Sequence, residues 1–213
     1  MSGSEFAKHP DMRDHDLHGS APDKCSTALL LIDIINDLDF PEADMLLRFA
    51  MPMAKALKDL KSKCRKCKVP AIYINDNFGR WQSNFAALVD HATKSKGRSV
   101  VKQLLPRKDD YFVLKPKHSA FYSTTLDTLL RYLGTKHLII TGMAANICVL
   151  FTANDAYMRD YDLWIPRNCV ASNTTRENEF ALQQMESILK ADIRPFERAR
   201  GHAFLKTRTR KKG

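Results

Sequence analysis

Three side chains combine nucleophilic and acid–base chemistry with positions at the ends of apolar segments. Asp33 interrupts the run ALLLIDI at residues 28–34 near its C-terminal end, Lys115 follows YFVL, and Cys148 lies in TGMAANICV. A thiol can attack a carbonyl carbon, a carboxylate can take up the thiol proton, and an ammonium group can hold the carboxylate ionised. These residue types are those of a cysteine hydrolase, if the fold brings them together.

Cys148 has the most specific setting of the three. The small-residue turn before it predicts a helix start, which puts the sulfur where unpaired N–H groups and the positive helix end favour the thiolate. We therefore expect a nucleophile present near neutral pH, with N–H groups nearby for an oxyanion. Taken alone, each residue has a plainer interpretation: Cys148 as a small core residue, Asp33 as a turn cap and Lys115 as a surface charge.

The segments between these residues alternate between strand and helix patterns. Short apolar runs predict strands at 28–34, 69–74, 111–115, 137–141 and 161–165, with a short sixth strand at 191–196. Helical spacing predicts helices at 41–68, split in two by Pro52, and at 85–91, 125–132, 147–158 and 177–189. We predict a three-layer α/β/α fold with a mostly parallel, Rossmann-like sheet of about six strands, whose carboxyl ends carry the site.

Composition and charge narrow the class of protein. The chain of 213 residues is 44% hydrophobic and 27% charged, without an apolar stretch long enough for a membrane span. Its net charge is +10, but seven cationic residues and no acidic one lie in residues 198–213. Because aromatic residues are not regularly interleaved with these cations and no nucleic-acid motif is recognisable, we expect a flexible tail without a nucleic-acid or membrane partner.

Domain boundaries follow from the same patterns. Residues 1–26 predict a polar N-terminal arm, and its MSGSEF start resembles a vector-derived sequence. Residues 27–197 form the predicted domain, and residues 198–213 the basic tail. Five cysteines in a domain of this size indicate no disulfide framework, and Cys64 and Cys67 form a CxxC without a second ligand pair. We expect a cytoplasmic protein in which this CxxC is structural or incidental.

Four motifs in order resemble those of the isochorismatase-like cysteine hydrolases, which include nicotinamidases, carbamoylsarcosine amidohydrolases and isochorismatases. The motifs are LLLIDIINDL, YINDNFGRW, KPKHSAF and TGMAANICV, and the similarity runs from about Thr27 to Phe196. The resemblance implies that Asp33 moves the proton, that Lys115 keeps Asp33 ionised, and that Cys148 attacks a carbonyl carbon to give an acyl-enzyme.

The resemblance also implies features beyond the three side chains. The peptide Met143–Ala144 would be cis, and the amides of Ala144 and Cys148 would form the oxyanion hole. By their position in the loops over the strand ends, Asn77, Arg80, Trp81 and Phe121 are candidate substrate contacts, with Arg80 able to meet a substrate carboxylate. Family members are commonly dimers or tetramers, so we expect a homo-oligomer that acts on a small molecule.

This sequence departs from the family pattern after its second predicted strand, and the difference affects which cofactor and which substrate we expect. Metal-binding nicotinamidases follow their second strand with Asp-x-His and a further His, whereas here Asp76 precedes Asn77 and Phe78. We therefore expect no metal and no cofactor, and interpret His91 and His118 as structural. The leading hypothesis is a metal-independent hydrolase of a small amide or carbamoyl compound. The alternatives are vinyl ether hydrolysis, which needs no thiol, and a binding protein on the same fold.

Overall fold

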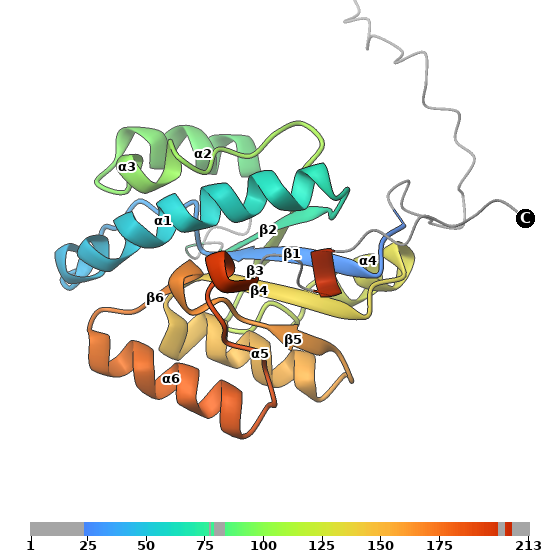
Figure 1. Ribbon diagram of the computed structural model, residues 1–213. Helices are drawn as coiled ribbons and strands as arrows, with labels where there is room; N and C mark the ends of the chain where they lie inside the picture. Colours follow the sequence, from blue (N-terminus) through green and yellow to red (C-terminus); the bar gives the residue numbers. More distant parts are fainter. Residues whose placement is uncertain (1–23, 77, 79–83, 200–202, 206–213) are drawn as a thin grey trace, which may run out of the picture.

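Five of the six apolar runs predicted as strands lie side by side in one parallel sheet (Figure 1). The computed structural model describes residues 24–76, 78, 84–199 and 203–205. Its strands are β1 (Thr27–Ile32), β2 (Ala71–Asp76), β3 (Tyr111–Lys115), β4 (His137–Met143), β5 (Asp162–Trp164) and β6 (Val170–Ala171). The strand order is β3-β2-β1-β4-β5, with β6 beside β4, and each of these pairings is parallel.

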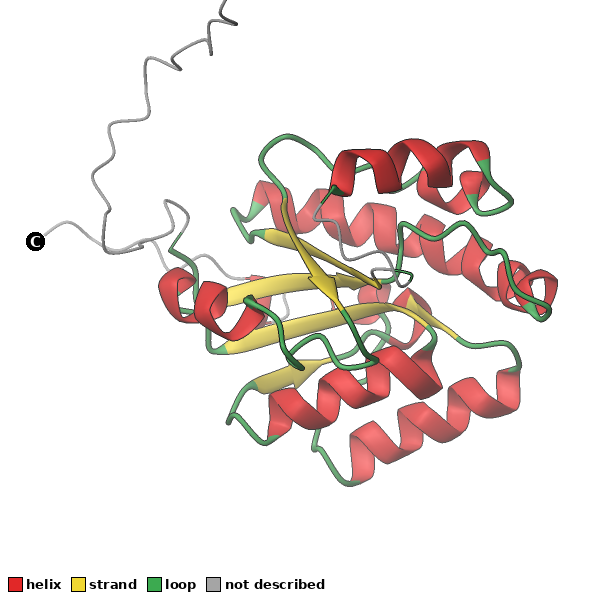
Figure 2. Ribbon diagram, turned by 180° about the vertical axis from the view of Figure 1, so that it is seen from behind, coloured by secondary structure: helices red, strands yellow, loops and turns green. Residues whose placement is uncertain are grey.

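Helices cover both faces of this sheet, as each parallel connection requires (Figures 1 and 2). One layer holds α1 (Ala43–Lys66), α2 (Phe85–Lys94) and α3 (Arg98–Val101). The other holds α4 (Leu126–Leu133), α5 (Leu150–Tyr157) and α6 (Thr175–Ser187). The predicted three-layer α/β/α architecture is therefore confirmed. Among the described residues, no helix is long and apolar enough to cross a membrane.

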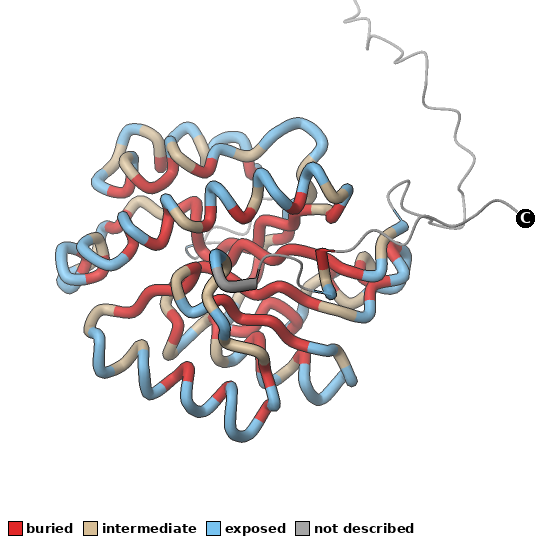
Figure 3. Tube along the Cα trace, in the orientation of Figure 1, coloured by how far each residue is buried: buried red, intermediate tan, exposed pale blue. Residues whose placement is uncertain are grey.

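The alternation of side chains along β1 divides the core between the two faces. Leu29 and Leu31 pack with the α1 layer, whereas Leu30 and Ile32 pack with the layer of α4, α5 and α6. All four side chains are fully buried, and Figure 3 shows the sheet as the buried centre of the molecule. A strand buried on both faces is expected to show a continuous apolar run, which is the pattern that identified it.

Pro52 does not divide the first helix, which contradicts the sequence prediction. The helix α1 continues from Ala43 to Lys66 with Pro52 inside it. The proline removes one backbone hydrogen bond, but the apolar stripe continues in phase through Met53, Ala54 and Leu57, all of which are buried. Burial of this stripe against the sheet outweighs the lost hydrogen bond.

The sixth strand also lies elsewhere than predicted. It is formed by Val170–Ala171, whereas in residues 191–196 Asp192 makes only an isolated bridge to Trp164. The ladder stops there because the N–H of Arg194 donates to the side chain of Asp192 and Pro195 has no N–H to donate. A strand cannot extend through two such positions.

Part of the predicted flexible tail packs on the domain. Residues Ala203–Leu205 form a short 3-10 turn in which Leu205 is buried in the core of the α1 layer. The ring of Phe204 stacks on His137 with 4.7 Å between the ring centroids. Apolar side chains within the basic segment thus hold this turn to the domain, so the interpretation of residues 198–213 as a uniformly flexible tail is wrong at these positions.

Gly142 allows β1 and β4 to approach closely at the edge that carries the site. Its φ is +115°, and a Cβ atom there would lie 2.1 Å from the carbonyl oxygen of Ile32. We expect Gly142→Ala to lower the free energy of unfolding by about 3 kcal/mol, measured by urea denaturation, because a strained backbone adds to the clash. Gly134→Ala is the control, since Gly134 also has positive φ but nothing lies within 4 Å. Equal losses would show that close approach is unimportant.

Candidate active site

The ends of three parallel strands place the predicted reactive groups at one edge of the sheet. Asp33 directly follows β1, Lys115 ends β3, and Cys148 lies in the π-helical turn η1 (Ala145–Val149) that follows β4. Chain order reverses between β1 and β4, since β2 and β3 lie on one side of β1 and β4 on the other. Such reversal points open a crevice beyond the strand ends where ligands bind.

The ammonium group of Lys115 lies at the centre of the site. Its Nζ is 3.0 Å from Oδ2 of Asp33, 3.5 Å from Sγ of Cys148 and 3.8 Å from Oδ2 of Asp76. The backbone N–H of Asp76 donates to Oδ1 of Asp33 at 2.8 Å. Lys115 is fully buried and Asp33 nearly so. A charge pair excluded from water in this way keeps its geometry only with such partners on each side.

Burial and neighbouring charges shift the pKa values of all three groups. Burial raises the pKa of Asp33, and Lys115, the Cys148 thiol and the Asp76 N–H offset this only in part. Burial alone would lower the pKa of Lys115, but the Asp33 carboxylate and the Cys148 sulfur outweigh it, so the pKa is raised. Lys115 therefore stays charged, and Asp33 is a stronger base than an ordinary aspartate.

Cys148 differs from the sequence prediction in its protonation state. Burial, and then the negative charge of Asp33, raise the pKa of Cys148 to about 12 despite the nearby Lys115. The thiol and not the thiolate is thus the resting form near neutral pH. The positive end of the helix does not offset the rise in pKa caused by burial beside the Asp33 carboxylate. The sequence pattern did not reveal this burial. A base must remove the proton as the sulfur attacks, and Asp33 accepts a hydrogen bond from this thiol.

The raised pKa of Cys148 makes a prediction for alkylation. Below that pKa the thiolate fraction grows about tenfold for each pH unit, so the rate of Cys148 alkylation by iodoacetamide should rise throughout pH 6 to 10 without a plateau. Peptide mass spectrometry after timed quenching measures the rate at each pH. A plateau beginning near pH 7 would contradict the assigned protonation state.

The turn that carries Cys148 begins at Ala144. The Met143–Ala144 peptide is cis, as the resemblance implies, and the carbonyl of Ala144 accepts hydrogen bonds from Ile147 and Val149. Ala145 and Val149 are buried against the sheet, which leaves Cys148 half-buried at the open side of the turn.

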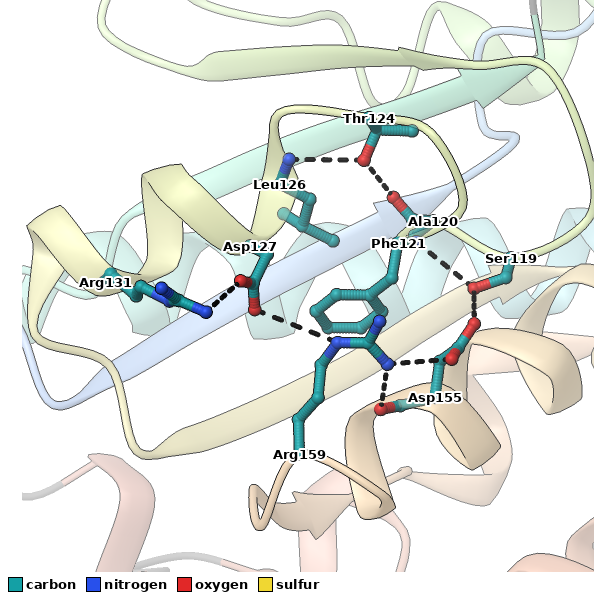
Figure 4. Close-up of polar contacts among 9 residues, drawn as sticks. All are labelled: Ser119, Ala120, Phe121, Thr124, Leu126, Asp127, Arg131, Asp155 and Arg159. Carbon is teal, nitrogen blue, oxygen red and sulfur yellow. Dashed lines mark hydrogen bonds and ion pairs between the residues drawn. The ribbon is translucent and has the colours of Figure 1, made fainter.

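The predicted substrate contacts are placed less well by the sequence. Asn77, Arg80 and Trp81 lie outside the described residues. Phe121 is buried in the core, with its ring centre 4.6 Å from the guanidinium carbon of Arg159 (Figure 4). The ring of Tyr161 lies 6.1 Å from it. Phe121 is therefore corrected from a pocket residue to a packing residue, because its ring is buried and packs against Arg159 in the turn that follows α5.

Two residues at the site were missed by sequence reasoning. His118 was interpreted as structural, yet it is exposed and its Nδ1 lies 3.9 Å from the Cys148 sulfur. Asp76 contacts both Asp33 and Lys115, and its position at the end of β2 was the available signal. His91 pairs with Asp37 at 3.2 Å. Across the described part of the chain, no three His, Cys, Asp or Glu side chains are arranged to hold a metal ion.

Comparison with known proteins places this geometry in a family. The model of the isochorismatase domain matches residues 27–193. The uncharacterized isochorismatase family protein YaaI of Bacillus subtilis (strain 168) is 45% identical over 170 residues, covering 80% of this chain and 94% of YaaI.

Two solved structures share the fold at lower identity. An isochorismatase family protein from Desulfovibrio vulgaris is 23% identical with a TM-score of 0.68, covering 83% of this chain and 97% of that one. N-carbamoylsarcosine amidase from Thermoplasma acidophilum is 24% identical with a TM-score of 0.62, covering 80% and 96%. The chain described here therefore belongs to the isochorismatase family and is a hydrolase.

Proposed function

We propose that this protein hydrolyses a C–N bond of a small amide or carbamoyl compound through a thioester intermediate on Cys148, without a metal ion. The observation that carries the proposal is the arrangement around Lys115, whose Nζ lies 3.0 Å from the Asp33 carboxylate and 3.5 Å from the Cys148 sulfur. These contacts support the proposed roles of Cys148 as nucleophile, Asp33 as base and Lys115 as fixed positive charge.

The protonation states suggest an order of events. The Cys148 thiol gives its proton to Asp33 while the sulfur forms a bond to the carbonyl carbon, and the carbonyl π electrons move to oxygen. The amides of Ala144 and Cys148 would hold this oxyanion. Asp33 then passes the proton to the nitrogen, the C–N bond breaks, and a thioester and a free amine remain.

Water completes the cycle in the reverse sense. Asp33 removes a proton from water as its oxygen attacks the thioester, the C–S bond breaks, and the sulfur recovers the proton. Lys115 stays charged throughout because its raised pKa keeps it protonated. The positive charge lowers the cost of a negative sulfur in a buried site.

An ammonia-release screen tests the proposal. The panel contains small primary amides, including nicotinamide, and N-carbamoyl amines such as N-carbamoylsarcosine, the compound named for the Thermoplasma acidophilum relative. We expect turnover of at least one class, unchanged by prior dialysis against a chelator. Turnover that is lost on chelation and restored by a divalent metal would contradict a metal-independent reaction.

A further inference from the structure

A short loop after β3 is fixed to the helix that continues from Cys148. The loop begins beyond Lys115 and reaches α4, and its residues 119–121 run along one face of α5 (Figure 4). Three consecutive loop residues are each held by one residue of α5 or its end. The pairs are Ser119 with Asp155, Ala120 with Thr152, and Phe121 with Arg159.

The hydrogen bonds in these pairs are directional. An ionised carboxylate has no proton to donate, so the Ser119 hydroxyl donates its proton to Oδ2 of Asp155. The lone pairs of the Ser119 oxygen remain to accept a hydrogen bond from the Phe121 N–H at 3.1 Å. The Ala120 N–H donates to Oγ1 of Thr152 at 3.0 Å. Ser119 and Thr152 are buried, so either hydroxyl would be costly to leave without its partner.

Arg159 completes the contact from the end of the helix. Its Nη1 donates to Oδ1 and to the carbonyl oxygen of Asp155, both at 2.7 Å, while its guanidinium carbon lies 4.6 Å from the Phe121 ring centre. The Asp155 carboxylate thereby receives hydrogen bonds from both Ser119 and Arg159. Thr152 and Asp155 of α5 and Arg159 in the turn after it thus fix residues 119–121.

This contact joins two elements that the sheet keeps apart. Lys115 ends β3 and Cys148 follows β4, and both β2 and β1 lie between these strands. The contact between Ser119 and Asp155 connects the loop directly to the helix. Ser119 lies four residues after Lys115, and Asp155 lies seven residues after Cys148. His118, which lies beside the Cys148 sulfur at 3.9 Å, is next to Ser119 in this loop and its ring is 5.4 Å from Phe151.

We infer that Asp155 and Ser119 are positioning residues that hold Lys115 and His118 against the sulfur of Cys148. The inference rests on the proposed function for its catalytic consequence. Its consequence for the reactivity of the Cys148 thiol does not depend on a substrate, because Lys115 stabilises the Cys148 thiolate as long as the two groups remain 3.5 Å apart. Misplacement by about 1 Å far from the reacting atoms can lower a rate by on the order of 100-fold.

Four variants test the positioning role. Asp155→Ala and Ser119→Ala should each lower kcat at least about tenfold with little change in KM, and slow the alkylation of Cys148 by iodoacetamide at pH 9. The double variant should be no slower than the slower single variant, since both remove one contact. Asp155→Asn keeps an acceptor for Ser119 and should recover most of the alkylation rate.

Asp127→Ala is the matched control. Asp127 binds Arg131 at 2.7 Å and Arg159 at 3.8 Å, and no hydrogen bond or ion pair in Figure 4 joins it to residues 119–121. We expect it to lower the melting temperature while leaving kcat and Cys148 alkylation unchanged.

The outcomes separate the two proposals. Normal alkylation and kcat in folded Ser119→Ala, or in Asp155→Ala with a lowered melting temperature, would overturn the positioning role. If Asp155→Ala does not fold, Ser119→Ala tests the positioning role instead, because it removes only one hydroxyl group and leaves the charged groups in place. If the wild-type protein hydrolyses no amide, the proposed function fails, and the alkylation rates still decide the positioning role.

Discussion

Cys148→Ala should lower kcat/KM for amide hydrolysis by about 10⁴-fold or more, with the fold intact. The loss is large because the sulfur forms the covalent intermediate, and among the described residues no other thiol is in contact with Asp33 and Lys115. The measurement is ammonia release under saturating and limiting substrate, with circular dichroism to confirm folding. The matched control is Cys67→Ala, which removes another half-buried thiol and should leave the rate unchanged.

The same variant distinguishes the alternatives. Vinyl ether hydrolysis by substrate protonation requires Asp33 and Lys115 but not the thiol. Cys148→Ala would then retain activity towards an ether while Asp33→Asn would lose it. A binding protein on this fold would show no turnover in either form. Amide hydrolysis that survives Cys148→Ala would refute the covalent mechanism.

Lys115→Met should both unfold more easily and lose activity. The change leaves the Asp33 carboxylate buried without its cation, and breaking a buried charge pair from one side costs about 3–5 kcal/mol. Loss of Lys115 also raises the pKa of Asp33 further, so a larger fraction of Asp33 is protonated and unable to take the thiol proton. Urea denaturation and ammonia release measure the two effects, with exposed Lys117→Met as control.

The stability loss in Lys115→Met should depend on pH in a defined direction. With the folded-state pKa of Asp33 above its unfolded value, the folded state holds a proton that the unfolded state releases between those two pKa values. Stability therefore falls as pH rises through that window, and the deficit shrinks as pH is lowered towards 5. A deficit that grows on acidification would contradict the assignment of Asp33 as the unpaired carboxylate.

The alternation of apolar runs and helical stripes was enough to predict the architecture. Strands such as 28–34 are buried on both faces, so their patterns are strong and do not depend on distant residues. Pro52 and residues 191–196 were misjudged because the outcome depended on long-range burial and on a side chain that competes for a backbone donor. Local propensity does not contain either effect.

The candidate site divides in the same way. Residue type and position at strand ends identified Asp33, Lys115 and Cys148, because parallel strands end at one edge of the sheet. The protonation of Cys148 could not be predicted, since it depends on burial and on a carboxylate more than a hundred residues away in the chain. Phe121 and His118 exchanged roles for a related reason: contacts with residues distant in the chain, Arg159 for Phe121 and Cys148 for His118, decide which loop residue is covered and which lies beside the thiol.

Acylation of a single cysteine tests the account most directly. The protein is mixed with p-nitrophenyl acetate, quenched in acid within the first turnover, and digested for peptide mass spectrometry. We expect an acetyl thioester on Cys148 and none on Cys25 or Cys67, with slower loss of the acetyl group in Asp33→Asn. An unmodified Cys148 during continued ester turnover would contradict the claim that its sulfur is the nucleophile.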